Sequence, residues 1–541
     1  MKIAKKIKDP IYGYIEVDNS LIKIIDSVYF QRLRNIIQTS YTSIYPSSLH
    51  NRFSHSLGVY WLGCLAFDCL ISNSGNVLSG IAKETIENIK KTFVFACLCH
   101  DLGHSPFSHT GEKFYPKTEI SDKLLKLVDD TQYEADLKKE CGVKEGAVVG
   151  KEHEIMSALL TLCIFGDYIG KENYAFFARC IIGLNYKELG SGIDYLLRAC
   201  VELLNSNIID IDKLDYLIRD SYMSGYMTVA IDYQRLLKGL YISKKENYSI
   251  GFEKSALSVL EAVLTAHDME RRWVQVHPII LYEDFLLKTI IRELENKYNN
   301  DEKKLFSLEA LTEVGTSLEE INEIRLLSDS DILYLAKKNY NDSDAVKEYF
   351  DRGKRRHPIW KSEAEFKILF DFSHNKYSKF LTAINRWEGE ILEGKYGVYS
   401  INDTFYEALS NEVADTQKAL EEQHDESKIS TFRERLTTLK KELELLEGIK
   451  NYLVEKGLSF DLVIVTQQQF KRNISKPAFK KLPIRFSNIG SDEKCMDEAT
   501  AIPLDVQDES GFFYIYYRRK DDEPELDVED FSKMIMRVAI M

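Results

Sequence analysis

Four side chains with metal-binding chemistry stand on stretches of sequence that are otherwise apolar. They are His55, His100, Asp101 and Asp212. Two neutral imidazoles and two carboxylates can hold one divalent cation and leave coordination positions open for water and substrate. A bound cation lowers the pKa of water, so a nucleophile forms near neutral pH. We therefore expect one divalent metal ion here, with Mg, Mn, Fe, Zn, Ni and Co all as candidates.

Helices buried in a core must position these ligands. Residues 91–109, KTFVFACLCHDLGHSPFSH, predict a helix buried on most sides that ends at the His-Asp pair. Gly103 and Pro106 interrupt the helix directly after that pair. A second core helix should carry His55 in its first turns, because apolar residues recur at helical spacing through residues 57–67.

A third helix is expected within residues 205–220, NSNIIDIDKLDYLIRD. On a helix, Asp212, Tyr216 and either Arg219 or Asp220 share one face. This face is either the wall of a site or a solvated surface with local ion pairs, and the second case is the commoner one.

The remaining sequence predicts a mainly α protein with a small α+β unit at its C-terminal end. Residues 1–290 read as a helical core and residues 291–457 as a charged helical region. Heptad-like leucines at 429–454 suggest a helical hairpin arm or a short coiled coil. The runs FDLVIV and FFYIYYRRK predict strands within the unit 458–541, and residues 526–540 predict a last amphipathic helix.

Composition narrows the class of protein. The chain of 541 residues has 44% hydrophobic residues and a formal charge of −14, which gives no strong nucleic-acid signal. The N-terminal residues lack an apolar leader, and we expect no stretch able to span a bilayer. Nine scattered cysteines without a CxxC pair fit a reducing compartment. These features predict a cytoplasmic protein that does not act at a membrane.

Six short segments carry a resemblance to a known family. In order they are DPIYGYIE, FQRLRNI, HNRFSHSLGV, CHDLGHSPFSH, HEIMS and IDIDKLDYLIRD, over roughly the first 230 residues. The chain resembles the HD-domain deoxynucleoside triphosphate triphosphohydrolases, including the vertebrate enzymes with a sterile alpha motif. The resemblance implies an HD core over residues 1–290. It also implies hydrolysis of dNTPs, dGTP among them, to deoxynucleoside and inorganic triphosphate.

The resemblance also implies roles for individual residues. The metal ligands would be the four residues named above. The residues for proton transfer and positioning would be His104, Glu112 and His153. The residues that contact substrate would be Gln38, Arg52, His109, Lys213, Tyr216 and Asp220. Within that set, Arg52 and Lys213 would meet phosphate, Tyr216 and Asp220 the sugar, and Gln38 the ribose 3′-hydroxyl.

The chain departs from the family pattern in two places. The segment before Gln38–Pro46 lacks the expected glycine run and is one residue shorter, so sugar or base selectivity could differ. The phosphate-binding arginine expected in the 260s is not evident, and His267, Arg271 or Arg272 are the candidates to replace it.

The family resemblance also implies a site for a regulatory nucleotide. Asp26, Gln31 and Arg34 match residues that hold an activating guanine nucleotide between subunits in the vertebrate enzymes. The resemblance thus implies a GTP or dNTP effector and a homo-oligomer, a dimer or a tetramer. The alternative interpretation is a plain polar face on a short helix.

Two other functions remain open. An HD phosphohydrolase could act on another nucleotide, such as a monophosphate or a signalling nucleotide. A nucleotide-sensing protein could bind through the same site and act through its extra helices on a partner. Lys213, Tyr216 and Asp220 favour the triphosphate branch, and the complete ligand set argues against a sensor without activity.

Overall fold

A computed structural model describes most of the chain and divides it into two compact units. It describes residues 3–39, 41–141, 149–206, 209–226, 229–244, 250–299, 304–312, 326–370, 378–423, 426–467, 477–486, 493–500 and 512–540. The first unit comprises Met1–Val274, Lys297–Leu335 and Arg472–Val506. The second comprises Gln275–Asn296, Ala336–Lys471 and Gln507–Met541.

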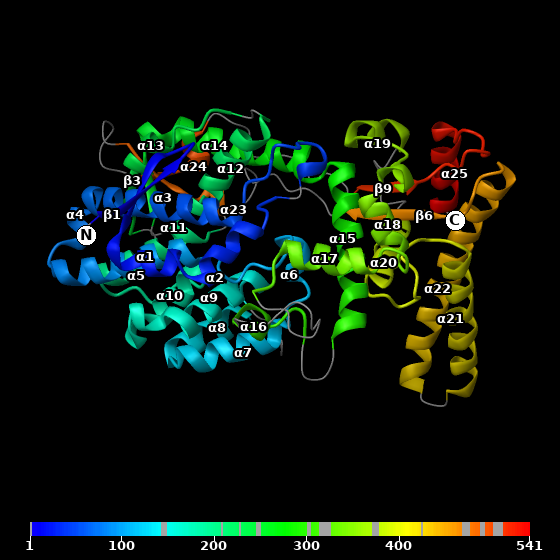
Figure 1. Ribbon diagram of the computed structural model, residues 1–541, viewed down its shortest axis with the longest axis horizontal. Helices are drawn as coiled ribbons and strands as arrows, with labels where there is room; N and C mark the ends of the chain where they lie inside the picture. The colour runs from blue at the N-terminus through cyan, green and yellow to red at the C-terminus, as the bar shows by residue number, and fades with distance from the viewer. Residues whose placement is uncertain are drawn as a thin grey trace. The chain divides into compact units, whose positions relative to one another are not determined.

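The first unit contains most of the described helices and two small sheets (Figure 1). Its helices up to residue 182 are α1 (Asn19–Ile25), α2 (Val28–Gln31), α3 (Arg52–Asn73), α4 (Gly75–Leu78), α5 (Lys83–Cys99), α6 (His109–Glu112), α7 (Lys117–Val128), α8 (Thr131–Cys141), α9 (Glu152–Phe165) and α10 (Tyr174–Ile182). The later ones are α11 (Gly192–Leu204), α12 (Ile211–Ser224), α13 (Tyr233–Lys238), α14 (Leu257–Glu270), α16 (Leu308–Thr312), α17 (Asp329–Lys338), α23 (Pro477–Lys480) and α24 (Met496–Ala499). Its strands are β1 (Ile3–Asp9), β2 (Gly13–Asp18), β3 (Leu240–Ile242), β4 (Ile250–Glu253), β7 (Pro483–Arg485) and β8 (Glu493–Cys495).

The second unit is also mainly helical, which confirms the predicted fold class. Its helices are α15 (Pro278–Tyr298), α18 (Asp344–Phe350), α19 (Glu363–Leu369), α20 (Ser378–Leu392), α21 (Asp403–Glu422), α22 (Glu426–Glu455) and α25 (Val528–Ile540). Its strands β5 (His357–Pro358), β6 (Leu462–Gln467) and β9 (Phe512–Tyr517) form one sheet in the order β5-β9-β6.

Three helices of the first unit have the positions that the apolar pattern predicts. Helix α3 begins after Asn51, whose side chain accepts from the Ser54 amide at 3.1 Å. Helix α5 ends at Cys99, and its last turns are completely buried. Helix α12 begins after Asp210, whose carboxylate accepts from the Lys213 amide at 2.7 Å. Both α5 and α12 pack against α3, so their ends meet in one place.

Helix α3 corrects one expectation. By length and composition alone it is apolar enough to cross a membrane, although the sequence pattern led us to expect no such stretch. Within this helix, 61% of the most apolar stretch of 18 residues is buried inside the protein. It also carries the buried side chains of Arg52 and His55, which indicates a core helix of the first unit.

The strands after residue 457 are shared between the units. The predicted strands are β6 and β9, which pair antiparallel with Ile464 opposite Ile515. Strand β7, by contrast, pairs parallel with β4 and completes a sheet in the order β3-β4-β7-β8 in the first unit. The bounds of the units therefore do not coincide with the three segments 1–290, 291–457 and 458–541.

The heptad-like segment 429–454 lies within α22. Helices α21 and α22 run side by side as a hairpin (Figure 1). Arg435 pairs with Glu412 at 2.9 Å, and Lys440 donates to Gln417 at 3.1 Å between the two helices. The apolar stripe of α22 is thus covered, at least in part, by a helix of the same chain.

Candidate metal centre

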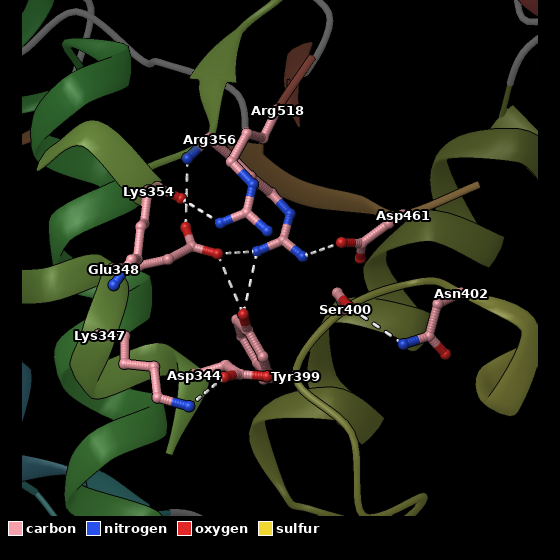
Figure 2. Close-up of a pocket in the computed structure, with 10 residues that line it drawn as sticks. All are labelled: Asp344, Lys347, Glu348, Lys354, Arg356, Tyr399, Ser400, Asn402, Asp461 and Arg518. Atoms are coloured by element: carbon pink, nitrogen blue, oxygen red, sulfur yellow. Dashed lines mark hydrogen bonds and ion pairs between the residues drawn. The ribbon is translucent and has the colours of Figure 1, made fainter. Parts of the chain in front are cut away.

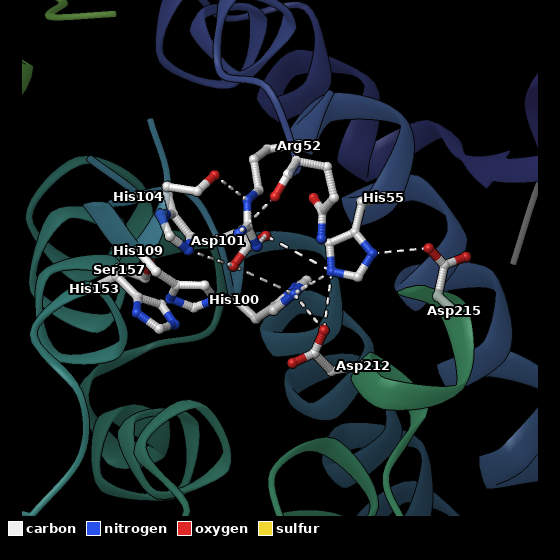
Figure 3. Close-up of polar contacts among 12 residues, drawn as sticks. Arg52, His55, His100, Asp101, His104, His109, His153, Ser157, Asp212 and Asp215 are labelled. Atoms are coloured by element: carbon white, nitrogen blue, oxygen red, sulfur yellow. Dashed lines mark hydrogen bonds and ion pairs between the residues drawn. The ribbon is translucent and has the colours of Figure 1, made fainter. Parts of the chain in front are cut away.

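The four expected metal ligands converge at the junction of α3, α5 and α12 (Figure 3). His55 Nε2 lies 2.9 Å from Asp212 Oδ1 and 3.3 Å from His100 Nε2. Asp101 Oδ2 lies 3.7 Å from His55 Nε2. The side chains of His55, His100 and Asp101 are buried. The Asp212 side chain is 39% exposed and gives the group an open side.

Hydrogen bonds fix the orientation of both imidazoles. His55 Nδ1 donates to Asp215 Oδ2 at 2.8 Å, and His100 Nδ1 donates to the Cys97 carbonyl at 3.0 Å. Since each Nδ1 donates in that bond, each Nε2 faces the other ligands and offers a lone pair to a metal ion that displaces its proton. Histidines that bind metals in proteins are held by the same kind of bond on the other ring nitrogen.

Electrostatics favour a positive charge at this point. Burial lowers the pKa of His55, but hydrogen bonds to Asp212 and Asp215 outweigh it and raise the pKa to about 10. For His100 too, burial is outweighed, here by Asp101 and Asp212, and the pKa is raised. Two carboxylates that face two imidazoles are stable together when positive charge lies among them, either as protons on the rings or as a metal ion that replaces those protons. The donor set therefore fits a divalent metal ion.

A second layer of charge supports His55. Asp215 is fully buried, accepts from Tyr12 at 2.7 Å and pairs with Arg219 at 2.8 Å. Arg219 also pairs with Asp9, at 2.9 Å. A Cβ atom at Gly58 would lie 1.9 Å from Asp215 Oδ1, so only glycine lets α12 approach α3 this closely. Sequence reasoning missed Asp215, although its position three residues after Asp212 was a usable signal.

The loop after Asp101 is held in an unusual conformation. Phe107 and Ser108 have φ values of 56° and 55°, which is costly for residues other than glycine. Asp329 accepts from the Phe107 amide at 2.7 Å and from the Ile37 amide at 2.9 Å. Burial raises the pKa of Asp329 to about 6. This residue was also missed, because it lies in another part of the chain.

The loop brings together a second polar group, formed by His104, His109, Glu112 and His153. One ligand atom from each lies within 4.8 Å of the others, so the group could also hold a cation. Glu112 contacts His153 Nδ1 closely and lies 3.3 Å from His109 Nδ1. The His109 side chain is 59% exposed, so the group reaches solvent.

His104 is the buried member of this group. Its ring stacks on that of His153 with the centroids 4.2 Å apart. Both ring nitrogens are buried without a hydrogen-bond partner among the described residues. Burial, together with the nearby charge of Arg52, holds the pKa of His104 well below its usual range. The imidazole is therefore neutral at pH 7 and able to hydrogen-bond a ligand.

Arg52 links Asp101 to the loop that follows it. Its guanidinium pairs with Asp101 at 2.7 Å and donates to Ser108 Oγ at 3.0 Å. Burial opposes ionisation of Asp101, but Arg52 outweighs it and holds the pKa of that carboxyl below its usual range. Arg52 thus keeps Asp101 ionised and adds a buried positive charge beside the candidate metal centre.

A third set of residues lies around Asp220. Its carboxylate contacts His50 Nε2 at 2.6 Å, and both side chains are buried. The His50 carbonyl accepts from the Gln38 amide at 3.0 Å. The side-chain oxygen of Gln38 is buried without a partner among the described residues. His50 was missed in the sequence, although it stands two residues before Arg52 in the same motif.

The other expected substrate residues are placed as follows. Lys213 donates to the Ser206 carbonyl at 2.6 Å and contacts Asp210 closely. The Tyr216 ring is half-buried, 6.5 Å from the ring of His267. Residues Arg271 and Arg272 begin a short π-helix directly after α14.

The three residues expected to bind an effector lie on exposed or half-buried positions near α1 and α2. The Arg34 guanidinium stacks 3.7 Å from the centre of the Phe53 ring and donates to Gln31 at 2.7 Å. Gln31 in turn donates to the Ile25 carbonyl at 2.8 Å. Asp26 forms an exposed ion pair with Lys5 at 3.4 Å. Their role as an effector site stays a prediction.

The amino-acid sequence is similar to those of several known proteins. The SAMHD1 homolog of Dictyostelium discoideum, a deoxynucleoside triphosphate triphosphohydrolase, is 32% identical over 244 residues, 44% of this chain and 40% of that protein. The enzyme of that name from Bos taurus is 27% identical over 364 residues, 63% and 56% of the two chains. An uncharacterized protein of Methanocaldococcus jannaschii is 30% identical over 316 residues, 58% and 54%. The chain thus spans about half the length of the curated relatives it matches.

Solved structures support the fold. A phosphohydrolase from Bacteroides thetaiotaomicron aligns with a TM-score of 0.53 at 19% identity, over 95% of this chain and 100% of that one. A hypothetical protein from Aquifex aeolicus gives the same TM-score at 18% identity, over 99% of both chains. No family model matches the chain. These findings confirm the resemblance in its sequence motifs: the chain is similar in sequence to the deoxynucleoside triphosphate triphosphohydrolases, and it shares the helical fold of the two solved structures.

Proposed function

We propose that the protein is a metal-dependent hydrolase of deoxynucleoside triphosphates that releases deoxynucleoside and inorganic triphosphate. The observation that carries this proposal is the convergence of His55, His100, Asp101 and Asp212 beside a second group of histidines. The names of the curated relatives support the substrate class.

A divalent cation held by the four ligands would act as a Lewis acid and lower the pKa of water at that point. The chain's own residues then orient the reaction. Asp215 and the Cys97 carbonyl hold the Nδ1 protons and aim both Nε2 atoms at the cation, which would replace any proton on them. Arg52 keeps Asp101 ionised and offsets the negative charge of a phosphate bound alongside.

The second group is suited to move a proton. Glu112 accepts from His153 Nδ1, which leaves His153 Nε2 to meet a phosphate oxygen or the leaving 5′-oxygen. Burial opposes ionisation of Glu112, but its bonds to His109 and His153 lower the pKa of the carboxyl. Glu112 therefore stays ionised and can stabilise a positive charge on His153. The neutral His104 completes this wall as a hydrogen-bonding group without charge.

Recognition of the sugar would fall to the set around Asp220. The unsatisfied oxygen of Gln38 is available to a ribose 3′-hydroxyl. A closely packed site of this kind rejects an added hydroxyl by steric exclusion and lost hydrogen bonds. Lys213 would have to exchange Asp210 for phosphate. Preference for dGTP belongs to this proposal as a narrower alternative.

The alternatives differ in product. An HD phosphohydrolase for another nucleotide would release orthophosphate or open a phosphodiester, and a sensor would release nothing. Chromatography of products from each dNTP, with metal titrated, separates these cases. Equal amounts of deoxynucleoside and triphosphate would support the proposal. Orthophosphate alone, or no turnover with any metal, would contradict it.

Regulation and location complete the proposal. A GTP or dNTP effector would bind at Asp26, Gln31 and Arg34 between subunits of a homo-oligomer, a dimer or a tetramer. The protein would act in the cytoplasm, where the free thiols in the described part of the chain stay reduced.

A further inference from the structure

The second unit contains a charged cavity of about 240 Å³ (Figure 2). All the residues that line it belong to the second unit, and none belongs to the candidate metal centre. Four cationic side chains face it: Lys347, Lys354, Arg356 and Arg518. Three carboxylates, of Asp344, Glu348 and Asp461, also line the cavity, so positive charge exceeds negative charge there although the whole chain has a net charge of −14.

Part of this charge has a structural role. The buried guanidinium of Arg356 lies between the carboxylates of Glu348 and Asp461 and contacts both (Figure 2). Tyr399 donates to Glu348 at 3.0 Å, and the Arg356 amide donates to the same carboxylate at 3.2 Å. A buried arginine between two carboxylates is an ordinary way to join α18 to the strands of this unit.

The network nevertheless leaves two atoms unsatisfied. Arg356 Nε and Asp461 Oδ1 are both buried and have no hydrogen-bond partner among the described residues. One is a charged donor and the other a charged acceptor, and both residues line the same cavity. Buried groups of this kind are rarely left unpaired, because desolvation is then uncompensated. A ligand that accepts at one end and donates at the other would satisfy both.

The rim cations indicate the charge of that ligand. Lys347 pairs with Asp344 at 2.8 Å, and its side chain is 30% exposed. Arg518 donates to the Lys354 carbonyl at 2.6 Å, and its position is half-buried. A partly exposed ion pair such as Lys347–Asp344 contributes little to stability, so Lys347 can exchange Asp344 for a phosphate. Phosphate oxygens accept from arginine and lysine, whereas Asp461 requires a donor such as a hydroxyl.

We propose that this cavity binds a small phosphorylated metabolite with free hydroxyl groups, of the size of a pentose phosphate. Its phosphate contacts Arg356 Nε, Lys347 and Arg518, and a hydroxyl donates to Asp461 Oδ1. The volume is below the range usual for larger organic ligands, which favours a sugar phosphate. The site is independent of the proposed hydrolysis.

Calorimetric titration of the full-length protein with three probes tests this proposal. Ribose 5-phosphate should bind, inorganic phosphate should bind more weakly, and ribose should not bind measurably. Lys347→Gln and Arg518→Gln should each weaken binding of ribose 5-phosphate about tenfold, the effect of one charge-assisted hydrogen bond. Asp461→Asn should remove the advantage of ribose 5-phosphate over phosphate.

Two controls keep the result interpretable. Lys533→Gln removes another exposed lysine of the second unit, one that pairs with Glu529 at 3.8 Å, and should leave binding unchanged. Asp101→Asn alters the candidate metal centre and should also leave binding unchanged. No binding of ribose 5-phosphate at millimolar concentration would overturn the proposal. So would wild-type affinity in both rim variants, loss of binding in Asp101→Asn, or equal affinity for phosphate and ribose 5-phosphate.

Discussion

The most informative single change is Asp215→Asn, because Asp215 contacts a candidate metal ligand, His55, without being a candidate ligand itself. Asp215 holds the proton of His55 Nδ1 at 2.8 Å and pairs with Arg219. An asparagine keeps the shape but can turn its amide N–H toward His55. The imidazole then places its proton on Nε2 and cannot bind a cation. Loss of such a supporting carboxylate lowers metal affinity or activity by about 10–100-fold.

The same change costs stability, and the structure offers a control for that part. Arg219 keeps Asp9 as a partner at 2.9 Å, so we expect a loss of about 1–3 kcal/mol in the free energy of unfolding. Asp9→Asn disturbs the same arginine from its other side but does not touch His55. It should therefore lower the melting temperature without weakening metal binding.

Metal titration by calorimetry and turnover at saturating metal measure the two effects separately. Metal affinity of Asp215→Asn within twofold of the wild-type protein would show that Asp215 does not position His55 for metal binding. An equal loss of metal affinity in Asp9→Asn would also refute this role, because the defect would then be a general destabilisation of the core.

Four further predictions follow from other contacts. Asp101→Asn should abolish metal content and turnover while circular dichroism stays native; full activity in a metal-stripped sample would contradict the assignment. Because burial raises the folded-state pKa of Asp329 to about 6, above 3.8, the protonated form is favoured on folding. Its contribution to stability is then lost as the pH rises from 4 to 6, so the difference in unfolding free energy between wild type and Asp329→Asn should change by about 3 kcal/mol. Gly58→Ala should destabilise the protein by about 1–3 kcal/mol and weaken metal binding, since the added Cβ meets Asp215. An unchanged melting temperature and metal affinity would contradict this, because α12 would then move away from α3 without cost. Light scattering should find an oligomer whose mass or activity responds to GTP or dGTP, and Arg34→Ala should remove the response and keep the metal; a strict monomer in every condition would refute this.

The sequence predicted the candidate metal ligands because polar residues on apolar helices are conspicuous. It could also place the ends of α5 and α12, where glycine, proline and a capping aspartate are local signals. It could not reveal Asp329, which fixes the loop after Asp101 from more than 200 residues away. Nor could it pair β7 with β4, because strand pairing at such separation leaves no periodic trace.

The same limit explains why the sequence did not flag α3 as a possible membrane span, although it predicted a core helix there. Helix α3 satisfies a membrane-spanning test by composition, since a helix covered by protein on most sides needs as many apolar residues as one covered by lipid. The difference lies in what covers it, and that information is tertiary.

The pairing of β7 with β4 has a consequence for biosynthesis. Ile484 lies beside Phe252 in the finished sheet, yet it leaves the ribosome roughly 230 residues later. At ordinary translation rates that interval is on the order of 10–50 s. During this time one edge of β4 has no neighbour from its own chain, and an unpaired strand edge is a place where nascent chains associate wrongly. The helices α3, α5 and α12 have all been synthesised before the interval begins. The candidate metal ligands are therefore complete in the nascent chain while this sheet still lacks its last strands.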